Sequence, residues 1–324
     1  MRLLALLTSL LLTAGLLIAQ PLDPDAYGAS FDLQTEDPEE LARTLCQPFT
    51  SDRDKAQVIF SWLANHIEYD LDEARRNRPI QIMYKSQEDL QRQIEGIRRT
   101  RMSRALRYRR GVCNHYASLF ETMCRAVGLD AGEIEGYVAR DPGRITSAGI
   151  ESNHVWNWVR LDGRICLLDV TYAAGMADMT GQTFTMEYEP RWFDVPPRIL
   201  IQTHFPDEAA DQRLPDPLTA DEFADRPFFY PASTRVPVIN WSPSGRSISL
   251  SEEVITIEVA FRQKPRGVYL IVDNIAQEVP TKWKGATVQL DIPADLLKRQ
   301  RQIEIGAEER DGTLSYLMAW KIVR

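Results

Sequence analysis

The spacing of apolar residues in the N-terminal part of the chain predicts amphipathic helices. Asp37-Pro38-Glu39-Glu40 places an N-cap residue, a proline and a glutamate where a short helix begins. A second helix begins at Ser51, and residues 113–127 form the clearest helix, which Gly128 is placed to end. Apolar positions repeat at intervals of three and four in both longer segments, so each helix is expected to bury one face. These positions are Ala56, Ile59, Phe60, Leu63 and Ile67, then Tyr116, Leu119, Phe120, Met123, Cys124 and Val127.

Alternating patterns then predict strands over Glu133–Ala139, Val155–Leu161 and Arg164–Val170. Asp162-Gly163 separates the last two strands and is a strong signal for a two-residue hairpin turn. Such a turn places Leu161 opposite Arg164. His154 then lies on the same sheet face as Asp169 and diagonal to it, at about 7–8 Å between backbones.

The remaining pattern predicts two folded units. Residues 184–230 are rich in proline and look irregular, and from about residue 233 the chain changes to short alternating runs with frequent turns. This is typical of a small Ig-like β-sandwich. We therefore expect a lead-in at 20–34, an α+β domain at 35–232 and the sandwich at 233–324. The runs expected as its strands are Val254–Phe261, Val268–Val272, Ala286–Ile292, Ile303–Glu308 and Leu314–Ile322.

Residues 1–19 resemble a secretory signal peptide. Arg2 is followed by an apolar run that is interrupted only by threonine, serine and glycine, and cleavage after Ala19 is plausible. An uncleaved membrane anchor is the alternative, but the run is short of the ~20 residues that a span needs. We expect a secreted or periplasmic protein with no stable membrane span.

Composition narrows the function classes. The 324 residues are 44% hydrophobic and 26% charged, which excludes a disordered or multi-spanning membrane chain. Lys and Arg number 38 against 46 Asp and Glu, a net charge of −8, which argues against nucleic acid as a partner.

One cysteine stands where a thiol becomes reactive. Cys113 begins a helix, and the unpaired N–H groups and dipole at a helix start stabilise a thiolate. The same N–H groups could hold the oxyanion of an acyl-transfer intermediate. A cysteine with a His154–Asp169 pair beside it has the components of thiol-based acyl transfer.

These residues resemble a known family. The segments GVCNHYASLF, SNHVWNWVRLDG and CLLDVTYAAG are similar to the three blocks of the transglutaminase-like superfamily of transglutaminase- and protease-like enzymes, and RWFDVPPRILIQTHFPDEAADQRL with DEFADRPFF is similar to an extension of its kyphoscoliosis-peptidase branch. The resemblance implies a core of the papain-like cysteine protease type, in which a helix-borne Cys packs on an antiparallel sheet. It implies a catalytic triad of Cys113, His154 and Asp169. The sequence shows no Ca²⁺-binding loop such as an EF-hand pattern, so we expect no metal and no cofactor.

Two departures from the family pattern leave the triad untouched. Tyr172 stands where tryptophan is commoner, and a tryptophan before Gln212 is missing. The family's second oxyanion donor has no clear counterpart; Trp62 is a candidate, although its helical position favours packing. His115 is expected to be structural, and His204 to serve mainly in packing.

Other residues leave alternatives open. Cys46 and Cys166 could form a disulfide in an oxidising compartment, but buried apolar fillers are the favoured interpretation. Eight arginines between residues 86 and 110 predict a solvated helix or arm, or alternatively a basic wall that attracts acidic substrates or lowers the pKa of Cys113.

The leading functional hypothesis is an exported cysteine-dependent acyl-hydrolase or acyltransferase that acts on peptide or glutamine-type amides through a thioester, with hydrolysis favoured over cross-linking. Its partner would be a protein or peptide substrate. The alternative is a non-catalytic peptide-binding or assembly module at the cell surface. The oligomeric state is left open.

Overall fold

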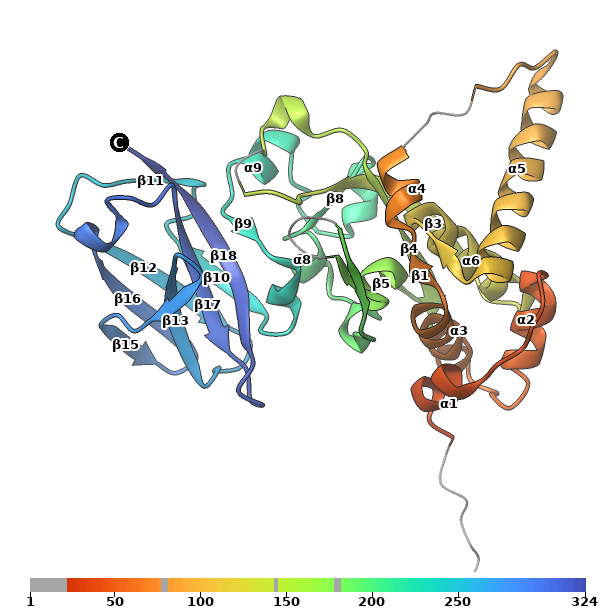
Figure 1. The fold of residues 1–324 in the computed structure, drawn as a ribbon, viewed down its shortest axis with the longest axis horizontal. Coiled ribbons are helices and arrows are strands. Elements are labelled where there is room, and N and C mark those ends of the chain that lie inside the picture. Colours follow the sequence, from red (N-terminus) through yellow and green to blue (C-terminus); the bar gives the residue numbers. More distant parts are fainter. Residues whose placement is uncertain (1–21, 77–80, 143–144, 178–181) are drawn as a thin grey trace, which may run out of the picture.

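The computed structural model describes residues 22–76, 81–142, 145–177 and 182–324, so the apolar run at the N-terminus lies outside the described residues (Figure 1). The expected α+β class is confirmed, with helices in the N-terminal part of the chain and strands in the rest. The helices before the central sheet are α1 (Pro24–Ser30), α2 (Pro38–Leu45), α3 (Asp52–His66), α4 (Leu71–Arg76), α5 (Gln87–Tyr108) and α6 (Cys113–Ala126).

The helix starts follow the capping signals of the sequence. The Asp37 carboxylate accepts from the backbone N–H of Glu39 at 2.8 Å, and the Ser51 hydroxyl accepts from Asp54 at 3.0 Å. The segment expected as a lead-in contains α1, because Asp23-Pro24 is a further N-cap and N1-proline pair. Helix α1 packs on α3 so closely that a Cβ on Gly28 would lie 2.9 Å from the Val58 carbonyl oxygen.

A four-stranded antiparallel sheet follows, in the order β5-β4-β3-β8. Strand β4 pairs with β5 in the predicted register, with Leu161 opposite Arg164. The hairpin turn has φ values of 51° at Asp162 and 77° at Gly163, as the two-residue turn requires. The strands are β3 (Ala131–Val138), β4 (His154–Leu161), β5 (Arg164–Leu168) and β8 (His204–Pro206).

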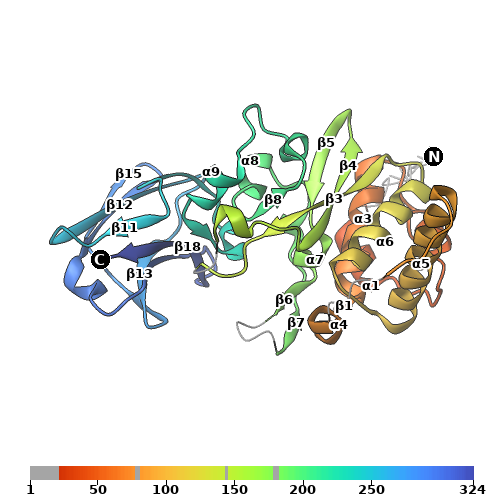
Figure 2. The same cartoon turned by 90° about the horizontal axis from the view of Figure 1, so that it is seen from above.

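Helix α6 packs between this sheet and the N-terminal helices (Figure 2). Its apolar stripe is buried as the spacing predicted, with Tyr116 and Phe120 fully buried. Together with Trp62, Phe60 and Trp156 they form one hydrophobic core between the helices and the sheet. Because α6 packs against the sheet on one side and against the N-terminal helices on the other, its start is held next to β4, and this fixes the position of Cys113.

The proline-rich region after β5 is more ordered than the sequence pattern predicted. Proline and glycine break it into pieces too short to leave a periodic signal. These pieces are α7 (Val170–Ala173), β6 (Gly175–Ala177), β7 (Phe184–Met186), α8 (Pro197–Leu200), α9 (Ala220–Ala224) and β9 (Phe228–Phe229). Strand β6 nevertheless pairs with β7, and β9 pairs with a strand of the C-terminal sheet.

The C-terminal residues form two sheets around a second hydrophobic core. The five predicted runs are all strands: β12 (Val254–Phe261), β13 (Gly267–Val272), β16 (Thr287–Pro293), β17 (Gln302–Glu308) and β18 (Leu314–Val323). The pattern missed four shorter strands: β10 (Val238–Ser242), β11 (Ser247–Ser249), β14 (Ile275–Gln277) and β15 (Thr281–Lys284). Strand β9 pairs with β18, so a segment before residue 233 also contributes to this sheet. The proposed boundaries stay a prediction.

Within the described ranges, the helices are all too short or too polar to span a bilayer.

Candidate active site

Cys113 is the first residue of α6, and a short parallel ladder leads the chain into that helix. Strand β1 (Glu68–Tyr69) pairs with β2 (Arg110–Gly111), two residues before Cys113. The backbone N–H of Val112 donates to Nδ1 of His115 at 3.0 Å, which supports the structural role expected for His115. Gly111 permits this arrangement, because a Cβ there would lie 2.7 Å from the Cβ of His115.

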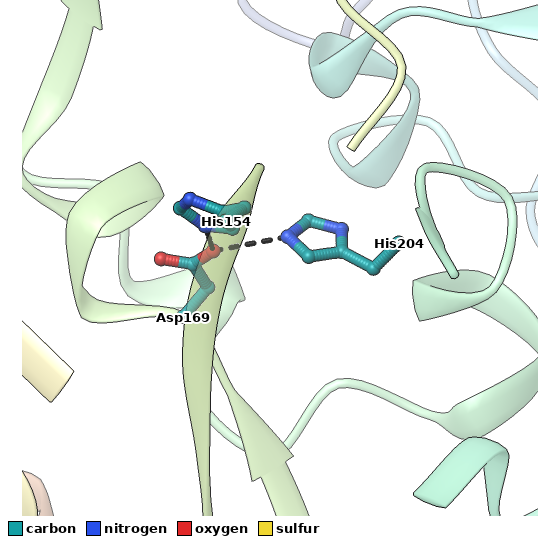
Figure 3. Close-up of side chains that lie close together, drawn as sticks. All are labelled: His154, Asp169 and His204. Carbon is teal, nitrogen blue, oxygen red and sulfur yellow. Dashed lines mark hydrogen bonds and ion pairs between the residues drawn. The ribbon is translucent and has the colours of Figure 1, made fainter. Parts of the chain in front are cut away.

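The structure brings His154 and Asp169 together (Figure 3). His154 begins β4, and Asp169 lies directly after β5 as the N-cap of α7. Nε2 of His154 lies 2.6 Å from Oδ2 of Asp169, and both side chains are buried. The diagonal placement inferred from the hairpin register therefore gives a direct hydrogen bond.

Asp169 is a fully hydrogen-bonded carboxylate without contact to solvent. Its Oδ1 accepts from the backbone N–H of Tyr172 at 2.9 Å, and its Oδ2 accepts from His154 and from Nε2 of His204 at 2.9 Å. Burial acts to raise the pKa of Asp169, but the charge of His154 and the hydrogen bonds from both histidines hold it well below its usual range. The carboxylate therefore stays ionised in the interior.

The thiol of Cys113 is coupled to His154. Burial acts to raise the pKa of Cys113, but a hydrogen bond with His154, its charge and the backbone N–H of Val155 outweigh burial and lower that pKa. Burial acts to lower the pKa of His154, but Asp169 and then Cys113 raise it to about 9. Because Asp169 occupies Nε2, Nδ1 is the ring nitrogen left to face the sulfur. The electrostatics therefore favour a thiolate–imidazolium pair.

Sequence reasoning missed the hydrogen-bonding role of His204, to which it assigned packing. His204 begins β8, lies opposite Val138 of β3, and is buried with its imidazole between Asp169 and Thr203. Packing is part of its role, since Trp156, Tyr172 and Trp192 have ring centroids 5.1, 5.2 and 5.5 Å away. The position of β8 depends on pairing with a strand far away in the sequence, so no local signal identified its partner.

Tyr172, the departure from the family pattern, contacts the site through its ring. Its ring stands edge-on to that of His154, with centroids 5.4 Å apart, and the ring of Trp156 is stacked with His154, with centroids 6.0 Å apart. These aromatic rings shield the imidazole from water, which strengthens its interaction with Asp169.

Trp62 does not face the site. Its Nε1 donates to the carbonyl of Phe31 at 2.9 Å, and its ring stacks on His66 and under the Arg109 guanidinium. The packing interpretation is confirmed.

The four cysteines are free thiols, and Cys46, Cys124 and Cys166 are buried, as expected for apolar fillers.

The arginine-rich segment is the helix α5, and several of its arginines hold it in place. Arg98 pairs with Glu133 at 2.6 Å and with Glu121 on α6. Just after α5, Arg109 pairs with Asp32 at 3.2 Å. The groups that lower the pKa of Cys113 are His154 and the backbone of Val155, so the interpretation as a structural, solvated helix is favoured over that of a basic wall.

A metal ion is an alternative explanation for this cluster. Among the described residues, one potential ligand atom from each of His154, Asp169 and His204 lies within 4.8 Å of the other two, which is close enough to hold an ion. A metal would need both Nε2 atoms unprotonated and directed at the ion. Here both lie at hydrogen-bond distance from one carboxylate oxygen, which a proton on each nitrogen explains. We therefore interpret the cluster as a hydrogen-bonded network.

Removal of metal tests this interpretation. Dialysis against EDTA is expected to leave the rate of Cys113 alkylation unchanged, because protons and not an ion hold the three side chains together. The measurement is iodoacetamide labelling before and after dialysis. A loss of labelling that Zn²⁺ restores would contradict it.

The fold and this arrangement define a class: an α+β domain with a partly buried cysteine at a helix start, coupled to a buried histidine and aspartate. Residues 39–170 match the family model described as "Transglutaminase-like superfamily". This part of the chain is therefore similar to the transglutaminase-like superfamily, and the resemblance noted from the sequence is confirmed.

Two curated proteins are similar to this chain over a longer stretch than the family model covers. The Kyphoscoliosis peptidase of Mus musculus is 32% identical over 186 residues, 57% of this chain and 25% of the relative. That of Homo sapiens is 30% identical over 187 residues, with the same shares. The chain spans about a quarter of the length of these relatives. A solved structure of a TGase is 16% identical and covers 51% of this chain and 34% of its own, but its TM-score of 0.28 is too low to support a conclusion.

Proposed function

We propose that this chain is a cysteine-dependent acyl-hydrolase or acyltransferase that acts on peptide or glutamine-type amides. The single observation that supports it best is the position of His154. Its Nε2 is hydrogen-bonded to an ionised, buried Asp169, and its interaction with Cys113 lowers the pKa of that thiol. A nucleophile, a base and a group that orients the base are the parts that thiol-based acyl transfer needs.

In the first step the Cys113 sulfur attacks the carbonyl carbon of the amide. Nδ1 of His154 holds the thiol proton and passes it to the nitrogen of the leaving amine, and the C–N bond breaks as a thioester forms on Cys113. Asp169 keeps the proton on Nε2 and stabilises the imidazolium. The unpaired backbone N–H groups at the start of α6 are the donors proposed for the oxyanion.

In the second step a water molecule attacks the thioester. His154 accepts a proton from the water, a carboxylic acid leaves, and the proton returns to the sulfur as the thiol re-forms. An amine in place of water would give transamidation with the same proton transfers. We propose that hydrolysis prevails, because an exported enzyme meets far more water than acceptor amine. Export is a prediction that depends on residues 1–19, which lie outside the described residues.

The pH dependence of alkylation tests the proposal. Because the pKa of Cys113 is lowered and that of His154 is raised to about 9, the thiolate is expected to form well below pH 7. Iodoacetamide should therefore label Cys113 about 100-fold faster at about pH 6 than an ordinary thiol of pKa near 8.5. Intact-mass kinetics across the pH range measures this rate.

Burial protects the other thiols and provides the control. It raises the pKa of Cys46 to about 12 and that of Cys166 to about 11, so labelling at acidic pH reports Cys113. Cys113→Ala should remove the label. A wild-type midpoint near pH 8.5 would instead support the non-catalytic binding module.

A further inference from the structure

We propose that His204 is a positioning residue, which holds the Asp169 carboxylate in place for His154 as a neutral imidazole whose tautomer Thr203 sets. This inference rests on the proposed function, and its tests are chosen so that the two can fail separately. It concerns a chain of side chains that runs from Thr203 through His204, Asp169 and His154 to Cys113. Figure 3 shows its three central members, His204, Asp169 and His154.

The first argument is geometric. Oδ2 of Asp169 accepts from Nε2 of His204 at 2.9 Å and from Nε2 of His154 at 2.6 Å, while Oδ1 is held by the N–H of Tyr172. Without His204, Oδ2 would accept one hydrogen bond only, and the carboxylate could rotate more freely about its bond to the Cβ. The second hydrogen bond from His204 restricts this rotation and keeps Oδ2 directed at His154.

The second argument concerns the proton on His204. Nδ1 of His204 lies 2.7 Å from Oγ1 of Thr203, and both side chains are buried. Nε2 must carry a proton to donate to a carboxylate, so in the neutral ring Nδ1 is an acceptor. The Thr203 hydroxyl has one proton and two acceptors within reach, Nδ1 of His204 at 2.7 Å and the Leu200 carbonyl oxygen at 3.3 Å. The shorter contact assigns the proton to Nδ1, which keeps the ring proton of His204 on Nε2.

The third argument is charge balance. Two imidazolium ions against one buried carboxylate would leave an uncompensated charge in the interior, which is costly. Burial lowers the pKa of His204, more than Asp169 raises it, and His154 lowers it further. His204 is therefore the neutral donor, and the positive charge is left to His154.

In the part of the chain that the structure describes, a small set of charged and titratable groups acts on these side chains, and Tyr116 of α6, whose pKa burial raises first and Asp169 raises further, is one of them. The others are Asp169 and Tyr172 from the N-terminal turn of α7, His154 from β4 and Cys113 from α6, with Tyr69 of β1 and Arg140 after β3 acting on Tyr172. The pKa of the Tyr172 hydroxyl is raised by burial first, so that group stays neutral. Among the described residues, Asp169 and His154 are the groups that link His204 to the thiol.

Variants of His204 separate hydrogen bonding from packing. His204→Phe keeps a ring among Trp156, Tyr172 and Trp192 but removes the donor, so the Asp169 carboxylate is no longer held toward His154 and the pKa of His154 falls. The midpoint of Cys113 alkylation is expected to rise by about one pH unit, which gives about a 10-fold lower rate at about pH 6. His204→Gln keeps an N–H donor and should restore most of the rate.

Two further variants provide the controls. Thr203→Val removes the hydroxyl that fixes the tautomer and should shift the midpoint in the same direction by less. Trp192→Phe changes the packing on His204 but no hydrogen bond to Asp169, so it should lower the melting temperature without moving the midpoint. A folded His204→Phe with the wild-type midpoint would overturn the proposal, and so would a wild-type midpoint in Thr203→Val if His204→Phe fails to fold.

A spectroscopic readout needs no catalysis. In protein labelled with ¹⁵N-histidine, His204 is expected to remain neutral and protonated on Nε2 between about pH 5 and pH 8. A proton on Nδ1, or an imidazolium in this range, would overturn the inference. An ordinary Cys113 midpoint in the wild type together with the expected His204 tautomer would instead mean that the proposed function fails while the network stands.

Discussion

Cys113→Ala is expected to abolish both the acyl adduct and turnover. In the proposed mechanism the sulfur of Cys113 is the atom that bonds to the carbonyl carbon of the substrate, and His154 serves as its base, with Nε2 hydrogen-bonded to Asp169. In a serine protease, removing the nucleophile costs about 10⁶-fold in turnover. We expect a loss on that scale.

Intact-mass measurement after incubation with peptide pools tests this expectation. The wild-type protein should gain the mass of an acyl group, and Cys113→Ala should gain none. Cys124→Ala is the matched control, because Cys124 lies on the same helix but is fully buried in the core. That variant is expected to lose stability and keep the adduct. An adduct that persists in Cys113→Ala would rule out this nucleophile.

Asp169→Asn is expected to give the second largest effect. An amide in place of the carboxylate would turn an N–H group, or a much weaker acceptor, toward the two imidazole nitrogens that now donate to Oδ2. His154 would then tend to carry its proton on Nδ1, where it cannot accept the proton of Cys113. The corresponding change in a serine protease lowers turnover about 10⁴-fold, and we expect a loss of that order.

The peptide that forms the adduct serves as the substrate for measuring turnover, and the alkylation midpoint reports the thiolate. In Asp169→Asn the midpoint should move toward that of an ordinary thiol, near pH 8.5. Asp194→Asn is the matched control, because Asp194 is also a hydrogen-bonded carboxylate, held by Arg53 and by Arg164 at 2.7 Å. It should lose stability only. Equal losses of turnover in both variants would show that Asp169 acts through stability alone.

The hairpin that carries His154 toward Asp169 could be predicted from the sequence alone. Asp162-Gly163 sets a two-residue turn, and that turn determines every pair of the β4–β5 ladder. The start of α6 and its buried apolar face could also be predicted, because helix capping and hydrophobic periodicity depend on residues within a few positions of one another.

The short pieces between β5 and the C-terminal sheets could not be predicted. Strand β9 is two residues long and is a strand only because it pairs with β18. Helices α8 and α9 are too short to show a periodic pattern of apolar residues. Their positions depend on tertiary contacts that override weak local preferences. The lead-in was misjudged for another reason, since the N-cap at Asp23-Pro24 was present and overlooked.

The sequence by itself determined the α+β class, the superfamily resemblance and the three residues proposed for catalysis, because those signals lie in short contiguous motifs. Only the tertiary structure decided that His204 shares Asp169 with His154, and that Trp62 and the arginines of α5 serve packing and anchoring. A hydrogen bond between side chains on separate elements depends on how strands β3 and β8 pair, and that pairing is a property of the packed core, not of either segment alone.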